Sequence, residues 1–253
     1  MSYSIRPLYF AHMYKYVENV QEKVHAIVYD KCNFNCAYCT THLRDRDEYK
    51  EYSEDEFIYV SSQLLQLGKS FKFTGGEPTL NDNILRDTKI VKDLGGFIYL
   101  DTNGSRPIKI QELIERKLVD VLSVSLKGLS AENAIFTSNC RNKNLCWNNV
   151  LKSVELGNNH RLPTIVTYVF DSCSDIKTLC NYVDIFKSYD NVIFKFNNLF
   201  YENEHKCDLK KIQETDFYLL MKHLLNLRPN LKNRIIGCNN EESITDFSAH
   251  VYL

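Results

Sequence analysis

Three cysteines near the start of the chain lie close enough together in the sequence to bind a single metal centre. Residues 30–39 read DKCNFNCAYC, so Cys32, Cys36 and Cys39 follow the spacing C-x3-C-x2-C. A loop with this spacing can bring three thiolates around one point, and thiolates are the usual protein ligands of iron–sulfur clusters. Three protein ligands leave one iron of a 4Fe–4S cube open, so a substrate could chelate that iron. These residues therefore indicate cluster chemistry first.

Two other interpretations of the same cysteines stay open on these residues alone. His42 lies three residues after Cys39, and a Cys3His tetrahedron would hold zinc. Three unligated thiols on a loop are the other alternative, although such thiols are exposed to oxidation. Free cysteines usually pack as small buried apolar side chains. Packing explains most of the six scattered ones, which are Cys140, Cys146, Cys173, Cys180, Cys207 and Cys238.

Three more polar motifs each lie at the end of a short run of strand-forming residues. Residues 73–78 read FTGGEP, residues 101–105 read DTNGS, and residues 122–128 read LSVSLKG. Each has an ordinary structural explanation. Adjacent glycines allow positive φ or close backbone approach, Asn-Gly is typical of turns, and a lysine at a strand tip is usually solvated. A functional role for them therefore depends on whether the fold brings them to the cysteines.

The elements that would position these motifs alternate along the chain. Six runs rich in Val, Ile, Phe and Tyr have the composition of strands; they are 24–29, 71–74, 97–101, 121–126, 163–169 and 192–197. Segments with helical apolar spacing lie between them or after the last one; they are 54–67, 84–94, 108–118, 145–156, 176–186 and 216–227. Ser53 is the expected N-cap of the first helix, and Pro107 leads into the third.

Six β–α units in series predict an α/β fold with parallel strands and right-handed crossovers. Six units are too few for a closed eight-fold barrel, so we expect a partial (β/α)6 TIM-like barrel, with a doubly wound sheet as the alternative. In both folds the active site lies at the C-terminal ends of the strands, where every motif above falls. We expect residues 1–253 to form one domain, with a core at 24–200 and a C-terminal extension at 201–253.

The cysteine loop follows the first strand and carries an aromatic residue, Tyr38, before its last cysteine. In these features the chain resembles the radical SAM superfamily, over residues 24–200. The resemblance implies an oxidoreductase with a 4Fe–4S cluster and S-adenosyl-L-methionine (AdoMet) as cofactors, and an external one-electron donor of the flavodoxin or ferredoxin type. In that family one electron from the cluster cleaves AdoMet to methionine and a 5′-deoxyadenosyl radical, which abstracts hydrogen from the substrate. The protein supplies geometry and exclusion of water.

The resemblance also assigns roles to the later motifs. FTGGEP is similar to the family's GGE motif, which meets the AdoMet amino group. The DTNG and LKG runs resemble the activating enzymes of pyruvate formate-lyase and anaerobic ribonucleotide reductase, whose lysine contacts the AdoMet carboxylate. Lys127 fits that role as a cation facing an anion. The residues expected to contact AdoMet are Tyr38, Gly75, Gly76, Glu77, Asp101, Asn103, Ser123, Ser125, Lys127 and Asn197.

The chain departs from those activating enzymes in two places. They carry D-x-K at the fourth strand, whereas Ser125 stands at the carboxylate position in this chain. This argues against the monovalent-cation site that some of them build. The lead-in at 25–31 also lacks their glycine-rich preamble. Beyond residue 200 there is no second C-x2-C motif, and among the scattered cysteines only Cys140 and Cys146 could add ligands, so one cluster is expected.

The composition argues against several other classes of protein. Apolar residues make up 44% of the 253 and charged residues 25%, and 31 Lys plus Arg nearly balance 32 Asp plus Glu. No strong field therefore attracts nucleic acid or an anionic membrane. Residues 1–16 lack the apolar core of a signal peptide, and no stretch approaches the ~20 apolar residues that span a bilayer. We expect a cytoplasmic protein with no membrane and no nucleic-acid partner.

Three functions remain compatible with these features. A glycyl-radical-enzyme activase, which takes hydrogen from a backbone glycine of a partner protein, is favoured by the chain length, the single cluster and the DTNG and LKG runs. The departures favour a tailoring enzyme acting on a small molecule, nucleotide or ribosomal peptide. A non-enzymatic zinc-binding module would leave GGEP and the β–α series unexplained. Because a partial barrel leaves a wide lateral mouth, which suits a macromolecular loop better than a metabolite, we expect a polypeptide substrate.

Overall fold

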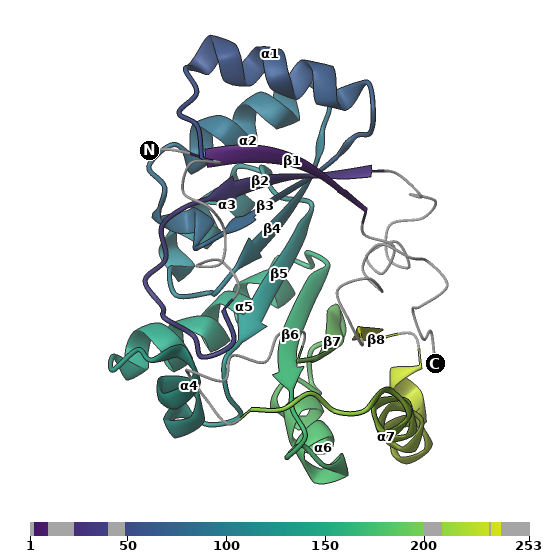
Figure 1. Ribbon diagram of the computed structural model, residues 1–253. Helices are drawn as coiled ribbons and strands as arrows, with labels where there is room; N and C mark the ends of the chain where they lie inside the picture. Colours follow the sequence, from purple (N-terminus) through teal and green to yellow (C-terminus); the bar gives the residue numbers. More distant parts are fainter. Residues whose placement is uncertain (1–2, 10–22, 40–48, 200–208, 233, 239–253) are drawn as a thin grey trace.

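The structure is a computed structural model that describes residues 3–9, 23–39, 49–199, 209–232 and 234–238. These residues form a single eight-stranded sheet whose strands are β1 (Tyr3–Tyr9), β2 (Lys23–Tyr29), β3 (Ser70–Gly75), β4 (Phe97–Thr102), β5 (Val121–Leu126), β6 (Thr164–Phe170), β7 (Val192–Asn198) and β8 (Ile235–Cys238). The strands lie side by side in sequence order (Figure 1). The β1–β2 pair is antiparallel, and β2 to β8 are all parallel. Within the described residues β1 and β8 do not pair, so the sheet remains open.

Helices connect the successive parallel strands and pack on one face of the curved sheet (Figure 1). The α-helices are α1 (Glu54–Leu65), α2 (Ile84–Asp93), α3 (Pro107–Glu115), α4 (Ala131–Ser138), α5 (Asn149–Asn159), α6 (Ile176–Ile185) and α7 (Glu214–Leu227). Three short helical turns accompany them, namely η4 (Pro78–Leu80), η5 (Asn144–Asn148) and η6 (Pro229–Leu231). In the part of the chain that the structure describes, no helix is long and apolar enough to cross a membrane.

Both faces of the parallel strands are buried, so the strands alternate between two apolar layers. On the helix-facing side, Phe71 and Phe73 of β3 belong to the same core cluster as Phe57 of α1. On the opposite, concave side a second cluster contains Val24, Phe97, Tyr99, Val121, Ile165, Ile193, Ile236 and Cys238. We refer to this concave side as the lumen face. Its far end, at the carboxyl ends of the strands, is where the polar motifs lie.

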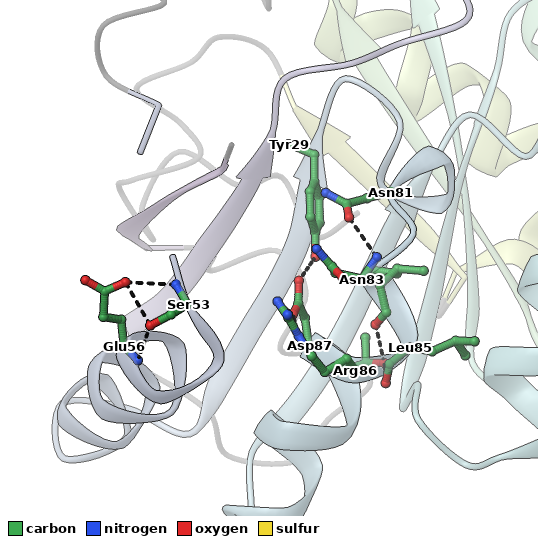
Figure 2. A network of polar contacts seen from close by, with 10 residues as sticks. Tyr29, Ser53, Glu56, Asn81, Asn83, Leu85, Arg86 and Asp87 are labelled. Carbon is green, nitrogen blue, oxygen red and sulfur yellow. Dashed lines mark hydrogen bonds and ion pairs between the residues drawn. The ribbon is translucent and has the colours of Figure 1, made fainter. Parts of the chain in front are cut away.

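Local contacts fix the helices next to the site. Ser53 caps α1 as the sequence predicts: its hydroxyl accepts from the amide of Glu56 at 3.3 Å, and the Glu56 carboxylate accepts from the Ser53 amide at 2.8 Å (Figure 2). Tyr29, the last residue of β2, donates its hydroxyl to buried Asp87 of α2 at 3.0 Å (Figure 2). This bond ties the end of β2 to the helix layer at the point where the cysteine loop begins.

The structure confirms the predicted α/β class and the partial barrel, with a different strand count. Each of the six expected strands is present within one residue of the predicted bounds, but β8 adds a seventh parallel strand and β1 an antiparallel one. β1 contains Pro7, which is tolerated in a strand chiefly at a sheet edge, and β8 has only four residues. Neither therefore resembles an interior strand in the sequence. The predicted helix at 145–156 instead begins as the π-helical turn η5, and α4 was not predicted.

Candidate active site

A cavity of about 240 Å³ opens at the C-terminal ends of β2 to β7. Its wall is built from the cysteine loop, the Gly-Gly turn after β3, the DTN run after β4 and the polar ends of β5, β6 and β7. Every residue predicted to form the site lines this cavity, except Glu77 and Ser123. The structure therefore brings together motifs that are separated by up to 165 residues in the chain, from Cys32 to Asn197.

The cysteine loop is held against α4, the helix that the sequence did not reveal. The amide of Asn35 donates to the carbonyl of Ser138 at 2.9 Å, and the amide of Ala37 donates to the carbonyl of Thr137 at 3.0 Å. The last carbonyls of a helix have no partner inside the helix, so they serve here as acceptors for the loop. His42, the residue that a Cys3His zinc site would need, lies outside the described residues.

Burial and one cation set the ionisation of the loop thiols. Burial raises the pKa of Cys32 to about 11 and also raises the pKa of Cys36, while the ammonium of Lys127 opposes both shifts. Lys127 lies over the ring of Tyr38, with its Nζ 5.4 Å from the ring centroid. Burial lowers the pKa of Lys127, but Coulombic attraction by the deprotonated forms of Tyr38 and the three loop cysteines outweighs burial and raises it overall. The ammonium of Lys127 therefore lies in the cavity wall beside the cysteines.

The two glycines after β3 are required by a close approach of the backbone. Gly75 has φ +118°, and a Cβ on it would lie 2.3 Å from the carbonyl oxygen of Tyr29. A Cβ on Gly76 would lie 2.1 Å from the carbonyl oxygen of Lys31. The amides of Gly76 and Glu77 donate to these same carbonyls at 2.8 and 2.6 Å. Only glycine can therefore hold this turn against the start of the cysteine loop.

Glu77 points away from the cavity and joins two motifs. Its side chain is fully buried. Its carboxylate accepts hydrogen bonds from the hydroxyl of Thr102 and the amide of Asn103, both at 2.6 Å, and from the amide and hydroxyl of Thr79. Burial raises the pKa of Glu77, and these hydrogen bonds oppose the shift. The direct contact with AdoMet expected from the sequence stays a prediction, and the bonds favour a positioning role.

The Asn103 side chain contacts the cysteine loop, which the sequence did not indicate. Its Nδ2 donates to Asn33 Oδ1 at 2.9 Å and lies 3.8 Å from the Sγ of Cys32. Asn33 in turn donates to the hydroxyl of Ser105 at 2.9 Å. Asn103 is thus shared between the DTNG turn and the cysteine loop, and Asn33 is a site residue that sequence reasoning missed. Its place beside Cys32 in the motif was the available clue.

Asp101 lines the cavity, and its carboxylate forms an ion pair and two hydrogen bonds with neighbouring strands. Its carboxylate pairs with Lys72 Nζ at 2.8 Å and accepts from the hydroxyls of Thr74 at 3.0 Å and Ser123 at 3.1 Å. Burial alone would raise the pKa of Asp101, but Lys72, with Lys195 behind it, lowers it. Ser123 therefore donates a hydrogen bond to Asp101 instead of lining the cavity, whereas Ser125 lines the cavity. Lys72 was missed, although it shares the alternating face of Thr74 in β3.

The amino-acid sequence matches the family model described as the radical SAM superfamily over residues 26–172. The match covers more than half of the chain and includes the cysteine, GGE, DTNG and LKG motifs. The chain therefore belongs to the radical SAM superfamily.

Individual proteins resemble the chain over shorter segments. A protein of Methanocaldococcus jannaschii named as a glycyl-radical enzyme activating enzyme is 29% identical over 130 residues, 49% of this chain and 47% of that protein. A protein of Pyrobaculum aerophilum named as a GTP 3′,8-cyclase is 33% identical over 91 residues, 36% of this chain and 29% of that protein. These matches span less than half of the relatives' own lengths.

Among solved structures, Streptococcus suis SuiB bound to precursor peptide SuiA has the same fold. It superposes with a TM-score of 0.67 at 15% identity, over 86% of this chain and 47% of the SuiB chain. At this level of identity the likeness concerns the fold alone. It agrees with an open, partial barrel of parallel strands.

Family membership confirms the predicted class of enzyme and its cofactors, a 4Fe–4S cluster and AdoMet, and it removes the zinc-binding module as an interpretation. The residues present fit these groups: three thiols, one cation and a turn that only glycine can form surround one cavity. In the described ranges no three or more His, Cys, Asp or Glu side chains already converge on one metal position.

A substitution of Glu77 distinguishes direct contact with AdoMet from a positioning role through Thr79, Thr102 and Asn103. In Glu77→Gln, an amide group must replace one of the two oxygens that accept from Thr102, Thr79 and Asn103, leaving a buried donor facing a donor. We expect unfolding to become easier by about 1–3 kcal/mol, measured by urea denaturation of the protein without cofactors. Glu155→Gln, an exposed change on α5, should alter stability by less than about 0.5 kcal/mol. Unchanged stability with weakened AdoMet binding would instead support direct contact.

Proposed function

We propose that this protein takes a hydrogen atom from a polypeptide substrate, as a glycyl-radical-enzyme activase does, after reduction by an external donor of the flavodoxin or ferredoxin type. When bound, the cluster and AdoMet supply the 5′-deoxyadenosyl radical chemistry of the superfamily. The observation that carries the proposal is one cavity that unites the cysteine loop, the Gly75–Gly76 turn and Lys127 at the carboxyl ends of the parallel strands. The M. jannaschii relative supports it by its name.

Different residues of the cavity bind different parts of the two cofactors. Cys32, Cys36 and Cys39 hold the cluster, and the Lys127 ammonium pairs with the carboxylate of AdoMet. The Gly75–Gly76 turn offers backbone close to the cysteine loop, where the amino group of AdoMet is bound in the family. Polar groups are added to the wall by Tyr38, Asn103, Ser125 and Asn197. Asp101 holds the ends of β3 and β5 together by accepting hydrogen bonds from both strands.

Apolar residues complete the wall and exclude water. Phe34 of the cysteine loop, Val169 of β6 and Leu199 after β7 line the cavity, and Phe34 and Leu199 are buried. A dry wall strengthens the ion pair of Lys127, because charges interact more strongly where water is excluded. It also protects a reactive carbon centre from side reactions.

The position of the cavity favours a polypeptide over a free metabolite. The cavity lies at the carboxyl ends of the parallel strands, so a chain presented there needs to insert only one residue. A free metabolite normally needs a pocket that buries most of its surface. The peptide-bound SuiB structure, with the same fold, is consistent with such access.

An activity assay tests the proposed substrate class. Reduced, anaerobically reconstituted enzyme with AdoMet is incubated with candidate polypeptides, including the products of neighbouring genes, and with GTP and other nucleotides. We expect a polypeptide to stimulate 5′-deoxyadenosine release several-fold and to transfer deuterium into it from a labelled carbon. Cys36→Ala enzyme, treated identically, gives the background. Stimulation by a nucleotide alone would favour the chemistry named for the P. aerophilum relative and would contradict the proposal.

A further inference from the structure

A second cavity, of about 600 Å³, lies next to the end of the sheet that carries the candidate active site. One wall is the loop after β6, at 172–175, the floor is the segment 210–213, and the other wall is one face of α7. In Figure 1 the segment that leads into α7 passes the carboxyl end of β6. We call this cavity the α6–α7 groove. The residues that line it are all different from those that line the active-site cavity.

Hydrogen bonds connect the groove to the wall of the active-site cavity. Asn198, the last residue of β7, is fully buried and lines the active-site cavity. Its Nδ2 donates to the carbonyl of Ile212 at 2.7 Å, and its Oδ1 accepts from the amide of Ile212 at 2.9 Å. Ile212 lines the groove. The amide of Ser172, three residues after the cavity residue Val169, donates to the carbonyl of Lys210 at 2.7 Å. The hydrogen-bonded pair of Asn198 and Ile212 therefore lies between the two cavities.

The groove offers apolar surface on its floor and on one wall. α7 turns one face to the core, where Phe217, Met221 and Leu224 are buried. Residues three or four positions apart share a face of a helix, and the groove-lining residues of α7 have this spacing; they are Asp216, Leu219, Leu220 and His223. Leu219 is 63% exposed, so a ligand that covers it removes apolar surface from water, which is favourable.

The composition of the groove favours a polypeptide over a nucleotide. Lys210 and Asp216 place charges of both signs on its rim, whereas a polyanion is normally bound by a basic face. Among the described residues that line the groove there is no Phe, Tyr or Trp, and nucleobases are commonly bound by stacking on such rings. An apolar side chain with uncharged backbone on either side fits this surface.

We propose that the α6–α7 groove binds the segment of the substrate polypeptide next to the residue that loses hydrogen. An apolar side chain of that segment packs on Ile212, Leu219 and Leu220. Binding in the groove holds the neighbouring residue at the active-site cavity, so contacts away from the reacting atoms contribute to its orientation. The groove rests on the proposed function for the identity of its occupant.

A peptide titration tests the groove without any activity. Protein carrying ¹³C-methyl leucine is reconstituted anaerobically with AdoMet, and the Leu219 resonance is assigned by its loss in Leu219→Ala. We expect a saturable shift of this resonance with the capped peptide Gly-Gly-Leu-Gly-Gly. Aspartate in place of the central leucine should weaken binding about tenfold or more, because the apolar contact is lost and a charge faces apolar surface. GMP should cause no shift, and the resonance of Leu227, an exposed leucine at the end of α7, should not move.

Three outcomes of the titration overturn the proposal. An absent or unsaturable shift of Leu219 would show that the groove does not take a peptide. Equal binding of the leucine and aspartate peptides would exclude recognition of an apolar side chain. Tighter binding of GMP than of the leucine peptide would assign the groove to a nucleotide. Each of these results is obtained whether or not a polypeptide stimulates the enzyme, so the groove can fail while the proposed function stands, and the reverse.

Kinetics then connect the groove to the substrate. For a polypeptide that stimulates 5′-deoxyadenosine release, Leu219→Glu should raise KM about tenfold or more and leave kcat nearly unchanged, because it removes binding that is equal in the ground state and the transition state. AdoMet affinity should equal that of the wild type. Leu227→Glu, on the same helix outside the groove lining, should leave KM unchanged. An unchanged KM in Leu219→Glu, or an equal rise in Leu227→Glu, would contradict the proposal.

Discussion

Replacing any one of Cys32, Cys36 and Cys39 by alanine is expected to remove the 4Fe–4S cluster and, with it, all cleavage of AdoMet. Three thiolates are the complete set of protein ligands that the motif provides, and the loss of one leaves two irons without a protein ligand. Wild-type protein reconstituted without oxygen should contain about four iron and four sulfide per chain. It should be brown, with absorbance that bleaches on reduction.

The remaining cysteines supply matched controls for this experiment. Cys173 is exposed, Cys180 is half-buried on α6, and Cys238 is buried on the lumen face. Changing each of them to alanine should leave the iron and sulfide content at the wild-type level. Stoichiometric zinc without iron in carefully anaerobic wild-type preparations would contradict the cluster assignment, as would an alanine variant of the loop that retains a full cluster.

Lys127→Met is expected to weaken AdoMet binding by a factor of ten to a hundred while the cluster remains. A hydrogen bond to a charged group contributes about 1.5–3 kcal/mol, which corresponds to this range, and methionine preserves the length of the side chain without its charge. Binding is measured by anaerobic calorimetry on reconstituted protein, and iron content is measured on the same samples.

Two further variants show whether charge at this position is the cause. Lys127→Arg retains the cation and should recover part of the affinity. Lys152→Met removes an exposed lysine of α5 and should bind AdoMet as tightly as wild type. Wild-type affinity in Lys127→Met would mean that the lysine does not contact AdoMet, and its contact with the Tyr38 ring would then be its main interaction.

The sequence by itself determined the class of enzyme and predicted where its polar motifs would meet. The cysteine loop is a local motif, because its three thiols are spaced within eight residues and need no distant partner to be recognised. The other motifs lie at the ends of separate strands. Since parallel strands share one carboxyl edge, the β–α alternation was enough to predict that Gly75, Asn103 and Lys127 would meet.

The tertiary structure alone decided which way the polar side chains point. Glu77 follows a Gly-Gly turn, where an exposed carboxylate would be expected. Its carboxylate is instead buried at the end of β4, where Thr102 and Asn103 donate hydrogen bonds to it. The docking of the cysteine loop on α4 is another such contact, because Asn35 and Ser138 are a hundred residues apart and no local pattern pairs them.

The α6–α7 groove was also invisible in the sequence, for a physical reason. The apolar spacing of α7 indicates which face enters the core, but it does not indicate what lies beside the outer face. The groove depends on the hydrogen bonds of Asn198 with Ile212, 14 residues further along the chain, and of Ser172 with Lys210. Such contacts between loops depend on how the strands are inclined and curved, and that is set by the packing of the whole helix layer.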